Sequence, residues 1–270
     1  MNLLNIAVMG STGKMGQSLI QLIVKNQEFK LTGAHEISNN PSIGKDAGYF
    51  IGEQTGVLIT ENLDEVFNES QVVIDFTRPD ASLKSIAKAR KLNKKIAYVL
   101  GTTGFNKTEI ESIKSASQDM PICFAPNMSV GVNVLISLIE KAANNLKDYD
   151  IEIVEAHHKH KVDAPSGTAI RLGQAAADGA GIDLDTNAVY SRYGREEKRA
   201  TNEIGFSTIR AGDIVGEHTV IFAGDGERIE LTHKATSRLN FASGALTAAK
   251  YISNEANGLF DMQDVLNLKK

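Results

Sequence analysis

The chain has 270 residues, of which 42% are hydrophobic and 23% charged, and its formal net charge is −4. This length suits two modest domains, and the negative charge disfavours a nucleic-acid binder, because phosphate binding requires a positive excess. No apolar stretch approaches the roughly 20 residues of a membrane span. One cysteine cannot form an internal disulfide, and the first ten residues lack the pattern of a signal peptide. We therefore expect a soluble, cytoplasmic protein with neither a membrane nor a nucleic-acid partner.

The first half of the chain alternates short apolar runs with amphipathic segments. Strands are predicted at 5–10, 30–36, 57–60, 71–76, 96–101 and 121–126, and helices at 13–26, 79–93 and 107–118. Such alternation is typical of a parallel sheet with helices on its faces. The sequence therefore predicts an α/β domain.

The pattern changes after residue 128. We expect a long buried helix at 129–146, a strand at 150–156, a helix at 166–179, a polar and mobile loop at 186–203, an antiparallel meander at 204–235 and a closing helix at 242–260. The predicted first domain comprises residues 1–128 with 240–270. The predicted second domain, 129–239, is smaller and α+β, with a mixed, largely antiparallel sheet.

A glycine-rich turn joins the first predicted strand to the first predicted helix. It contains Gly10, Gly13 and Gly16. Gly10 would permit the turn, Gly13 the approach of a pyrophosphate to the backbone, and Gly16 close packing of helix on strand. The spacing is G-x-x-G-x-x-G rather than G-x-G-x-x-G, so the turn alone is also compatible with a connection that binds nothing.

Glu36 favours the dinucleotide interpretation. It ends the second predicted strand, 20 residues after Gly16, where a carboxylate can accept hydrogen bonds from an adenosine ribose. A solvated acid at a strand end is the alternative. Small residues at 101–104 and 125–131 also follow buried strands, where they could receive a nicotinamide ring or form plain connections.

Two common reductase chemistries are disfavoured. None of the six tyrosines has a lysine four residues later, which excludes the Tyr-x-x-x-Lys pattern. A thiohemiacetal mechanism requires a reactive cysteine, but Cys123 lies in an apolar strand. Acid–base chemistry must therefore come from other residues.

The stretch EAHHKHKVDAPSGTA, residues 155–169, holds three of the six histidines. In an extended strand His157 and His158 face opposite sides, and a turn in KVDAP could bring Lys161 back over the same pocket. Ser166 or Asp163 could cap the following helix and leave N–H groups for a carboxylate. We favour a cationic pocket for a small dianion over a solvated loop. A metal site on the histidines is the least favoured, because no zinc-binding spacing occurs.

The same stretch resembles the signature of the 4-hydroxy-tetrahydrodipicolinate reductase (dihydrodipicolinate reductase) family. The similarity extends along the chain, through GSTGKMG, IDFTRPDAS, GTTGF, SVGVNVL, IGFSTIRAGDIVGEHTV and GLFDM. It implies a Rossmann-type cofactor domain and a smaller domain that binds substrate and builds a homotetramer. It also implies the reduction of a small cyclic dicarboxylate, hydroxy-tetrahydrodipicolinate, by NADH or NADPH, with loss of water, in diaminopimelate and lysine synthesis.

The resemblance also implies roles for individual residues. His157 matches the family's proton donor or acceptor and Lys161 its proton donor. Contacts to the substrate carboxylates fall on His158, Ser166, Gly167 and Thr168. Cofactor contacts fall on Gly10, Ser11, Thr12, Gly13, Lys14, Met15, Glu36, Gly101, Thr102, Thr103, Ala125, Pro126, Asn127 and Met128.

The residue after the ribose-binding acid departs from the family's pattern. Many members have an arginine there that can hold a 2′-phosphate, whereas this chain has Ile37. We therefore expect a preference for NADH, which Lys14 in the glycine turn could partly offset in favour of NADPH. The competing interpretations are a metal-dependent hydrolase and a nucleotide-binding module without catalysis.

Overall fold

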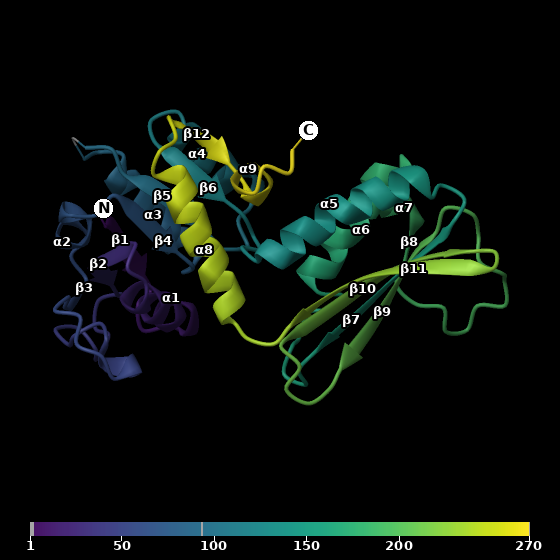
Figure 1. Ribbon diagram of the computed structural model, residues 1–270, viewed down its shortest axis with the longest axis horizontal. Helices are drawn as coiled ribbons and strands as arrows, with labels where there is room; N and C mark the ends of the chain where they lie inside the picture. The colour runs from purple at the N-terminus through teal and green to yellow at the C-terminus, as the bar shows by residue number, and fades with distance from the viewer. Residues whose placement is uncertain (1–2, 93, 270) are drawn as a thin grey trace. The chain divides into compact units, whose positions relative to one another are not determined.

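The computed structural model describes residues 3–92 and 94–269 and divides the chain into two compact units. Unit 1 comprises residues 1–130 and 238–270, and unit 2 comprises residues 131–237. Both boundaries lie within two residues of the expected ones. Each unit has its own sheet and helices (Figure 1).

Unit 1 contains a seven-stranded sheet of order β12-β6-β5-β4-β1-β2-β3, in which every pairing is parallel. Its strands are β1 (Leu4–Met9), β2 (Phe29–His35), β3 (Ile59–Thr60), β4 (Val72–Asp75), β5 (Ala97–Leu100), β6 (Pro121–Phe124) and β12 (Gly258–Phe260). Its helices are α1 (Lys14–Lys25), α2 (Leu63–Asn68), α3 (Pro79–Ala89), α4 (Lys107–Ala116), α8 (Leu239–Ile252) and α9 (Met262–Val265), with a 3₁₀ turn η1 (Tyr49–Ile51).

Both faces of this sheet are covered, as the apolar strands predict. Along β1, Ile6 and Val8 pack in a core with α1 and α8, whereas Ala7 and Met9 pack in a core with α2, α3 and α4. Alternate side chains of a strand point to opposite faces, so a strand buried on both sides is apolar at every position. The expected Rossmann-type sheet is confirmed.

Two expected helices are shorter than predicted. The helix expected at 79–93 is α3, which ends at Ala89, and position 93 lies outside the described residues. The helix expected at 242–260 was wrong beyond Ile252, because 258–260 forms β12 beside β6. Leu259 and Phe260 follow the weak helix formers Asn257 and Gly258, and Phe260 packs against the core that contains α8.

Unit 2 contains a five-stranded sheet of order β11-β10-β7-β9-β8 and a separate core. The elements of this part are α5 (Val130–Asn145), β7 (Asp150–His157), α6 (Gly167–Ala180), α7 (Leu184–Asn187), β8 (Ala188–Val189), β9 (Ile204–Arg210), β10 (Gly216–Gly224) and β11 (Glu227–Ala235). Apolar side chains of α5 and α6 pack on one face of the sheet. The expected smaller α+β unit with a mixed sheet is confirmed, but the sheet is not largely antiparallel, because β9 pairs in parallel with both β7 and β8.

The meander expected at 204–235 was wrong at its first junction. β10 and β11 form an antiparallel hairpin, but β9 pairs with β7 in parallel, and β7 lies between β9 and β10. Residues 211–215 pass over the end of β7, where Ala211 N–H donates to the His157 carbonyl at 2.9 Å. Because of this arrangement, residues of β9 and β10 lie on either side of the end of β7.

The polar segment expected as a mobile loop at 186–203 has anchors along its length. It begins with the end of α7 and with β8, which pairs with β9. Arg192 contacts Glu152 and Glu203, and Arg199 contacts Asp150.

Among the described residues, no helix has the length and apolar character needed to cross a membrane.

Candidate active site

The glycine turn of unit 1 leaves no room for side chains at two of its positions. Gly10 has a φ of +65°, and a Cβ there would lie 2.9 Å from Thr77 Cγ2. A Cβ at Gly16 would lie 2.2 Å from the Gly10 carbonyl oxygen, so α1 can approach the end of β1 only with glycine at this position. Gly13 is the N-cap of α1 and donates its N–H to Gly10 at 3.0 Å.

The carboxylate of Glu36 is held against this turn. Glu36 follows β2, is buried, and accepts hydrogen bonds from Thr12 N at 3.0 Å and Thr12 Oγ1 at 2.7 Å on Oε1. Its Oε2 accepts from Ile37 N at 3.1 Å. Among the described polar atoms, Ser11 Oγ in the same turn is buried without a hydrogen-bond partner.

The expected cofactor residues lie at one end of the strands of the unit 1 sheet, in or next to the turns that follow their carboxyl termini. β1, β2, β4, β5 and β6 run parallel, so the turns after their carboxyl ends are neighbours, the usual position of a ligand crevice in such sheets. Gly101 follows β5, and a Cβ there would lie 2.2 Å from Phe76 Cε1. Ala125 follows β6 and donates its N–H to Leu100 at 3.1 Å.

Sequence reasoning missed a buried acid beneath these turns. Asp75 ends β4 and is fully buried; its carboxylate accepts from Thr77 N at 2.8 Å, Thr77 Oγ1 at 2.6 Å and Tyr98 Oη at 2.6 Å. Ser82 bonds Thr102 at 2.9 Å in the same cluster. Burial, and secondarily Asp75, raises the pKa of Tyr98 well above its usual value, so its hydroxyl stays protonated and donates.

In unit 2, the face of β7 that α6 covers changes from apolar to polar. Ile151 and Ile153 belong to the core, and Glu155 and His157 follow on the same face because strand side chains alternate. Glu155 is 1% exposed. The acid and the histidine therefore lie where the core ends, toward the start of α6.

Five donors surround the Glu155 carboxylate. Oε2 contacts His157 Nδ1 at 2.6 Å and accepts from Arg210 Nη1 at 2.9 Å. Oε1 accepts from Arg210 Nη2 at 2.7 Å, Ser166 N at 3.1 Å and Thr208 Oγ1 at 3.3 Å. Burial raises the pKa of Glu155, but the bonds from Arg210 and His157 outweigh it, so the pKa lies below its usual value and the carboxyl is ionised at neutral pH.

His157 is consequently a neutral imidazole with a defined tautomer. Burial is the largest influence on its pKa and lowers it, against the opposing effect of Glu155. Because ionised Glu155 can only accept, Nδ1 must carry the proton and Nε2 the lone pair. Nε2 lies over Gly216, where a Cβ would be 3.0 Å away. This nitrogen can accept a proton.

Ser166, the N-cap of α6, is held by a second buried histidine. Its Oγ accepts from Ala169 N at 3.1 Å and lies 2.9 Å from His218 Nε2. Burial, followed by the proximity of His157, lowers the pKa of His218 to about 4. The rings of His157 and His218 meet edge to face, with centroids 5.1 Å apart.

The remaining predicted residues lie in the loop between β7 and α6 or at the start of α6. Lys161 N–H donates to the His158 carbonyl at 3.1 Å, which closes a turn at 158–161, just before the KVDAP segment where the turn was expected. Its Nζ binds Asp163 at 2.7 Å, and Asp163 does not cap α6. Lys161 is near enough to lower the pKa of His157 further. Gly167 is exposed, with open space where a Cβ would be.

The histidines do not assemble a metal site among the described residues. No group of three His, Cys, Asp or Glu side chains there could hold an ion. The rings of His158 and His160 are 6.2 Å apart and tilted. Cys123 is a buried free thiol, and burial raises its pKa to about 12.

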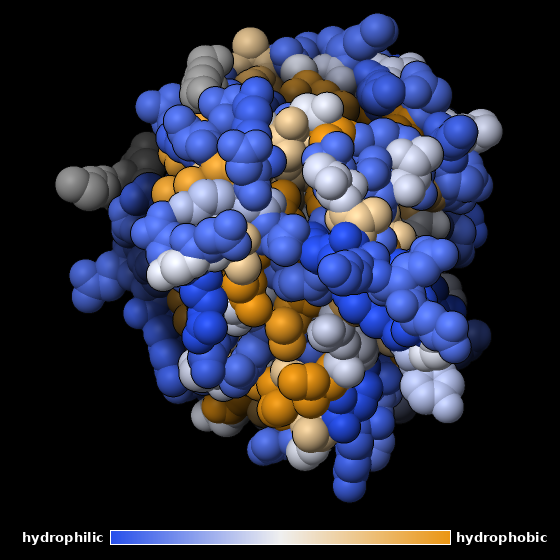
Figure 2. All heavy atoms as spheres, turned by 90° about the vertical axis from the view of Figure 1, so that its right-hand side faces the viewer, coloured by the Kyte–Doolittle hydropathy of each residue, from blue (hydrophilic) through white to orange (hydrophobic). Residues whose placement is uncertain are grey.

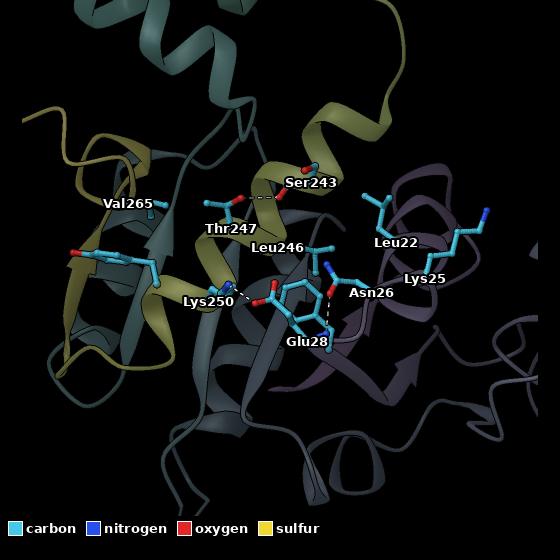
Figure 3. A pocket seen from close by; sticks show the side chains of 11 residues that line it. Leu22, Lys25, Asn26, Glu28, Ser243, Leu246, Thr247, Lys250 and Val265 are labelled. Carbon is cyan, nitrogen blue, oxygen red and sulfur yellow. Dashed lines mark hydrogen bonds and ion pairs between the residues drawn. The ribbon is translucent and has the colours of Figure 1, made fainter. Parts of the chain in front are cut away.

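Unit 1 also has a groove near the amino-terminal end of β2, which is the opposite end from the glycine turn (Figure 3). It has a volume of about 650 Å³ and lies where α1 ends and β2 begins, beside α8. Lys250 of α8 binds Glu28 there at 2.6 Å. Its lining contains none of the predicted site residues.

A parallel sheet with a glycine turn after β1 and an acid after β2 is the arrangement of Rossmann-type dinucleotide-binding domains. Two family models cover most of the chain: "Dihydrodipicolinate reductase, N-terminus" matches residues 4–128 and "Dihydrodipicolinate reductase, C-terminus" matches residues 131–266. The chain belongs to the dihydrodipicolinate reductase family.

The sequence similarity to named relatives extends over the whole chain. The chain is 52% identical to the 4-hydroxy-tetrahydrodipicolinate reductase of Nitrosospira multiformis, with all of both chains covered, and 52% identical to that of Nitrosomonas eutropha, with the same coverage. Among solved structures, a dipicolinate-bound dihydrodipicolinate reductase from Paenisporosarcina sp. TG-14 has a TM-score of 0.76 at 21% identity, covering 97% of this chain and 99% of that one. At this identity the structural likeness concerns the fold.

Proposed function

We propose that this chain is an NAD(P)H-dependent reductase that converts 4-hydroxy-tetrahydrodipicolinate to tetrahydrodipicolinate in diaminopimelate and lysine synthesis. The reaction consumes one hydride and one proton and releases one water. The observation that carries the proposal is the buried His157–Glu155 pair beside the N-terminus of α6, in a chain about half identical to relatives named for this activity.

The glycine turn fits the pyrophosphate of a dinucleotide. A Cβ at Gly10 or Gly16 would fill the space that keeps the turn tight, and the buried Ser11 hydroxyl needs a partner. The cofactor would supply the hydride when bound. We assign its contacts to Gly10, Ser11, Thr12, Gly13, Lys14, Met15, Glu36, Gly101, Thr102, Thr103, Ala125, Pro126, Asn127 and Met128.

The substrate carboxylates would bind at the start of α6. This helix has 14 residues, and its N-terminus favours an anion. We assign the carboxylate contacts to His158, Ser166, Gly167 and Thr168. The reductase from Paenisporosarcina, whose solved structure contains bound dipicolinate, supports a cyclic dicarboxylate as the ligand class.

His157 and Lys161 would handle the proton. Hydride addition leaves a carbanion- or enamine-like centre that must be protonated, and a nearby cation stabilises its charge. Nε2 of His157 carries a lone pair in the ligand-free site, and we propose Lys161 as the proton donor. His157 can act once it has accepted a proton.

We further propose a preference for NADH over NADPH. The Glu36 carboxylate would bind the ribose hydroxyls and repel a 2′-phosphate, and Ile37, two-thirds exposed, offers no charge to a phosphate. Lys14 at the start of α1 could still favour a phosphate.

We further propose that the protein forms a homotetramer and is located in the cytoplasm. In Figure 2 hydrophobic side chains gather in the lower middle of a mostly hydrophilic face. Large apolar side chains of unit 2 are also exposed, among them Leu138 and Ile209. Exposed apolar surface of this kind is common at subunit contacts.

The test is an assay of NADH absorbance with freshly synthesised substrate. Wild-type protein should oxidise NADH only when substrate is present, and His157→Gln and Lys161→Met should each lower kcat by about 10²–10⁴-fold. Lys159→Met, an exposed lysine of the same loop, should leave kcat unchanged. A wild-type protein that ignores the substrate would contradict the proposal, and an unchanged rate in either variant would remove that residue from it.

A further inference from the structure

In the proposed function Glu155 and Arg210 take part in no step of the reaction, although the buried Glu155 lies beside His157 and is bound by the partly exposed Arg210. We infer that Glu155, held by Arg210, is a positioning residue that fixes the tautomer of His157 and joins its ring to the N-terminus of α6. The inference rests on the proposed function for the importance of His157. The coupling itself can be tested without substrate.

The strand register brings these residues together. β7 and β9 pair in parallel, with Glu155 opposite Thr208 and His157 opposite Arg210. β10 pairs with the other edge of β7 and places His218 opposite Glu155. Side chains at paired positions share a face, so all five lie on the side that α6 covers.

Arg210 makes a buried carboxylate tolerable at this position. Its two terminal nitrogens bind both oxygens of Glu155, at 2.7 and 2.9 Å, a two-pronged geometry that is strong and directional. Arg210 Nη2 also donates to the Asp163 carbonyl at 2.6 Å. The guanidinium therefore fixes the carboxylate and also anchors the loop that carries Lys161.

The carboxylate in turn holds two parts of the proposed site. It receives His157 Nδ1–H at 2.6 Å and the Ser166 N–H at 3.1 Å. The imidazole and the residue that caps α6 are thus attached to one group. Loss of this group would leave the ring free to adopt the other tautomer, in which Nδ1 carries the lone pair.

Several charged groups influence His157, and they act in different directions. Glu155 on β7 raises its pKa, whereas Lys161 of the loop and Arg210 on β9 lower it. His218 on β10 faces the ring edge to face, and Asp163 is bound to Lys161. Removing Glu155 and removing Arg210 should therefore shift the titration of His157 in opposite directions.

The experiment is an NMR titration of the His157 ring in the full-length protein, with the resonance assigned from His157→Gln. Glu155→Gln should lower the midpoint, because the anion that favours the protonated ring is gone. Arg210→Gln, on a partly exposed side chain, should raise the midpoint and remains informative if Glu155→Gln fails to fold. Glu152→Gln is the matched control, because Glu152 lies on the other face of β7 and also binds two arginines.

Activity gives a second readout. Glu155→Gln should lower kcat by about 10–100-fold, as loss of an orienting partner commonly does, while the Kd for NADH stays unchanged. A His157 midpoint that is the same in wild type and Glu155→Gln, or one that shifts equally in Glu152→Gln, would overturn the inference. If His157→Gln retained full kcat, His157 would lose its proposed role in proton transfer, while the opposite titration shifts would still support the coupling.

Discussion

Thr12 donates two hydrogen bonds to a single oxygen of Glu36, from its N–H at 3.0 Å and from its hydroxyl at 2.7 Å. Thr12 belongs to the turn after β1, and Glu36 follows the neighbouring strand β2. The bonds join the loop proposed for the pyrophosphate to the acid proposed for the ribose. The proposed dinucleotide site is therefore already ordered without ligand.

Thr12→Val removes the hydroxyl bond and keeps the shape of the side chain. A hydrogen bond to a charged group contributes about 1.5–3 kcal/mol, so we expect the Kd for NADH to rise by about 10-fold or more. Fluorescence titration of NADH measures this change. Thr247→Val, which removes an exposed hydroxyl on α8, is the control, and equal Kd values for Thr12→Val and wild type would show that the bond does not prepare the site.

Ile37→Arg should shift cofactor use toward NADPH. Ile37 is 66% exposed, so an arginine there needs no repacking and could bind a 2′-phosphate in two-pronged fashion. We expect the ratio of kcat/KM for NADPH to that for NADH to rise by about 10-fold, since one such contact contributes about 1–2 kcal/mol. Leu58→Arg, an exposed position elsewhere in unit 1, should leave the ratio unchanged. Equal kcat/KM values in the wild type would argue against the NADH preference.

We expect the free energy of unfolding to fall at low pH because of the buried histidines. The pKa of His218 is about 4 in the folded chain, mainly because of burial, against a usual value of 6.5. Between these values the unfolded chain binds more protons than the folded one, so the free energy of unfolding falls as the pH drops. Burial also lowers the pKa of His35, His157 and His233, which adds to the effect.

The contribution of His218 can be isolated by substitution. Between pH 7 and pH 5 it corresponds to about 2 kcal/mol of unfolding free energy. His218→Asn keeps a polar partner for Ser166 and should reduce the difference in denaturant-unfolding free energy between these pH values by that amount. His160→Asn, at an exposed position, should not change it, and a His218→Asn protein with the wild-type difference would contradict the assignment.

Cys123 should be chemically silent. It is fully buried in β6, and burial, aided by Asp261 and Asp264, raises its pKa to about 12. A thiol in this state has almost no thiolate at neutral pH. Cys123→Ala should keep wild-type kcat and KM, and the native thiol should react with a thiol reagent only after unfolding. Loss of activity on rapid modification of the native protein would contradict this view.

The grouping of the candidate cofactor residues could be predicted because its signals are local. Gly10 and Gly13 lie in the turn after β1, Gly16 lies in the first turn of α1, and Glu36 follows the next strand, so the βα pattern alone brings them together. Asp75 was missed because it ends a uniformly apolar strand and its partners Tyr98 and Thr102 come from the next strand and its turn.

The unit 2 site depends on pairing that the sequence order does not reveal. Arg210 reaches Glu155 only because β9 lies beside β7 in parallel, whereas consecutive strands suggested a β9–β10 hairpin. One signal was available: Glu155 continues the alternate positions of Ile151 and Ile153, so an acid falls in the core pattern of its strand. His218 likewise continues the pattern of Val220 and Phe222.

The most direct test is a crystal structure of the protein with NADH and dipicolinate. We expect the pyrophosphate at Gly10–Met15 and the dicarboxylate ring within hydrogen-bonding reach of Lys161, His158 and the N–H groups at the start of α6, with His157 still bound to Glu155. A ring bound away from His157 and Lys161, or no nucleotide at the glycine turn, would contradict it.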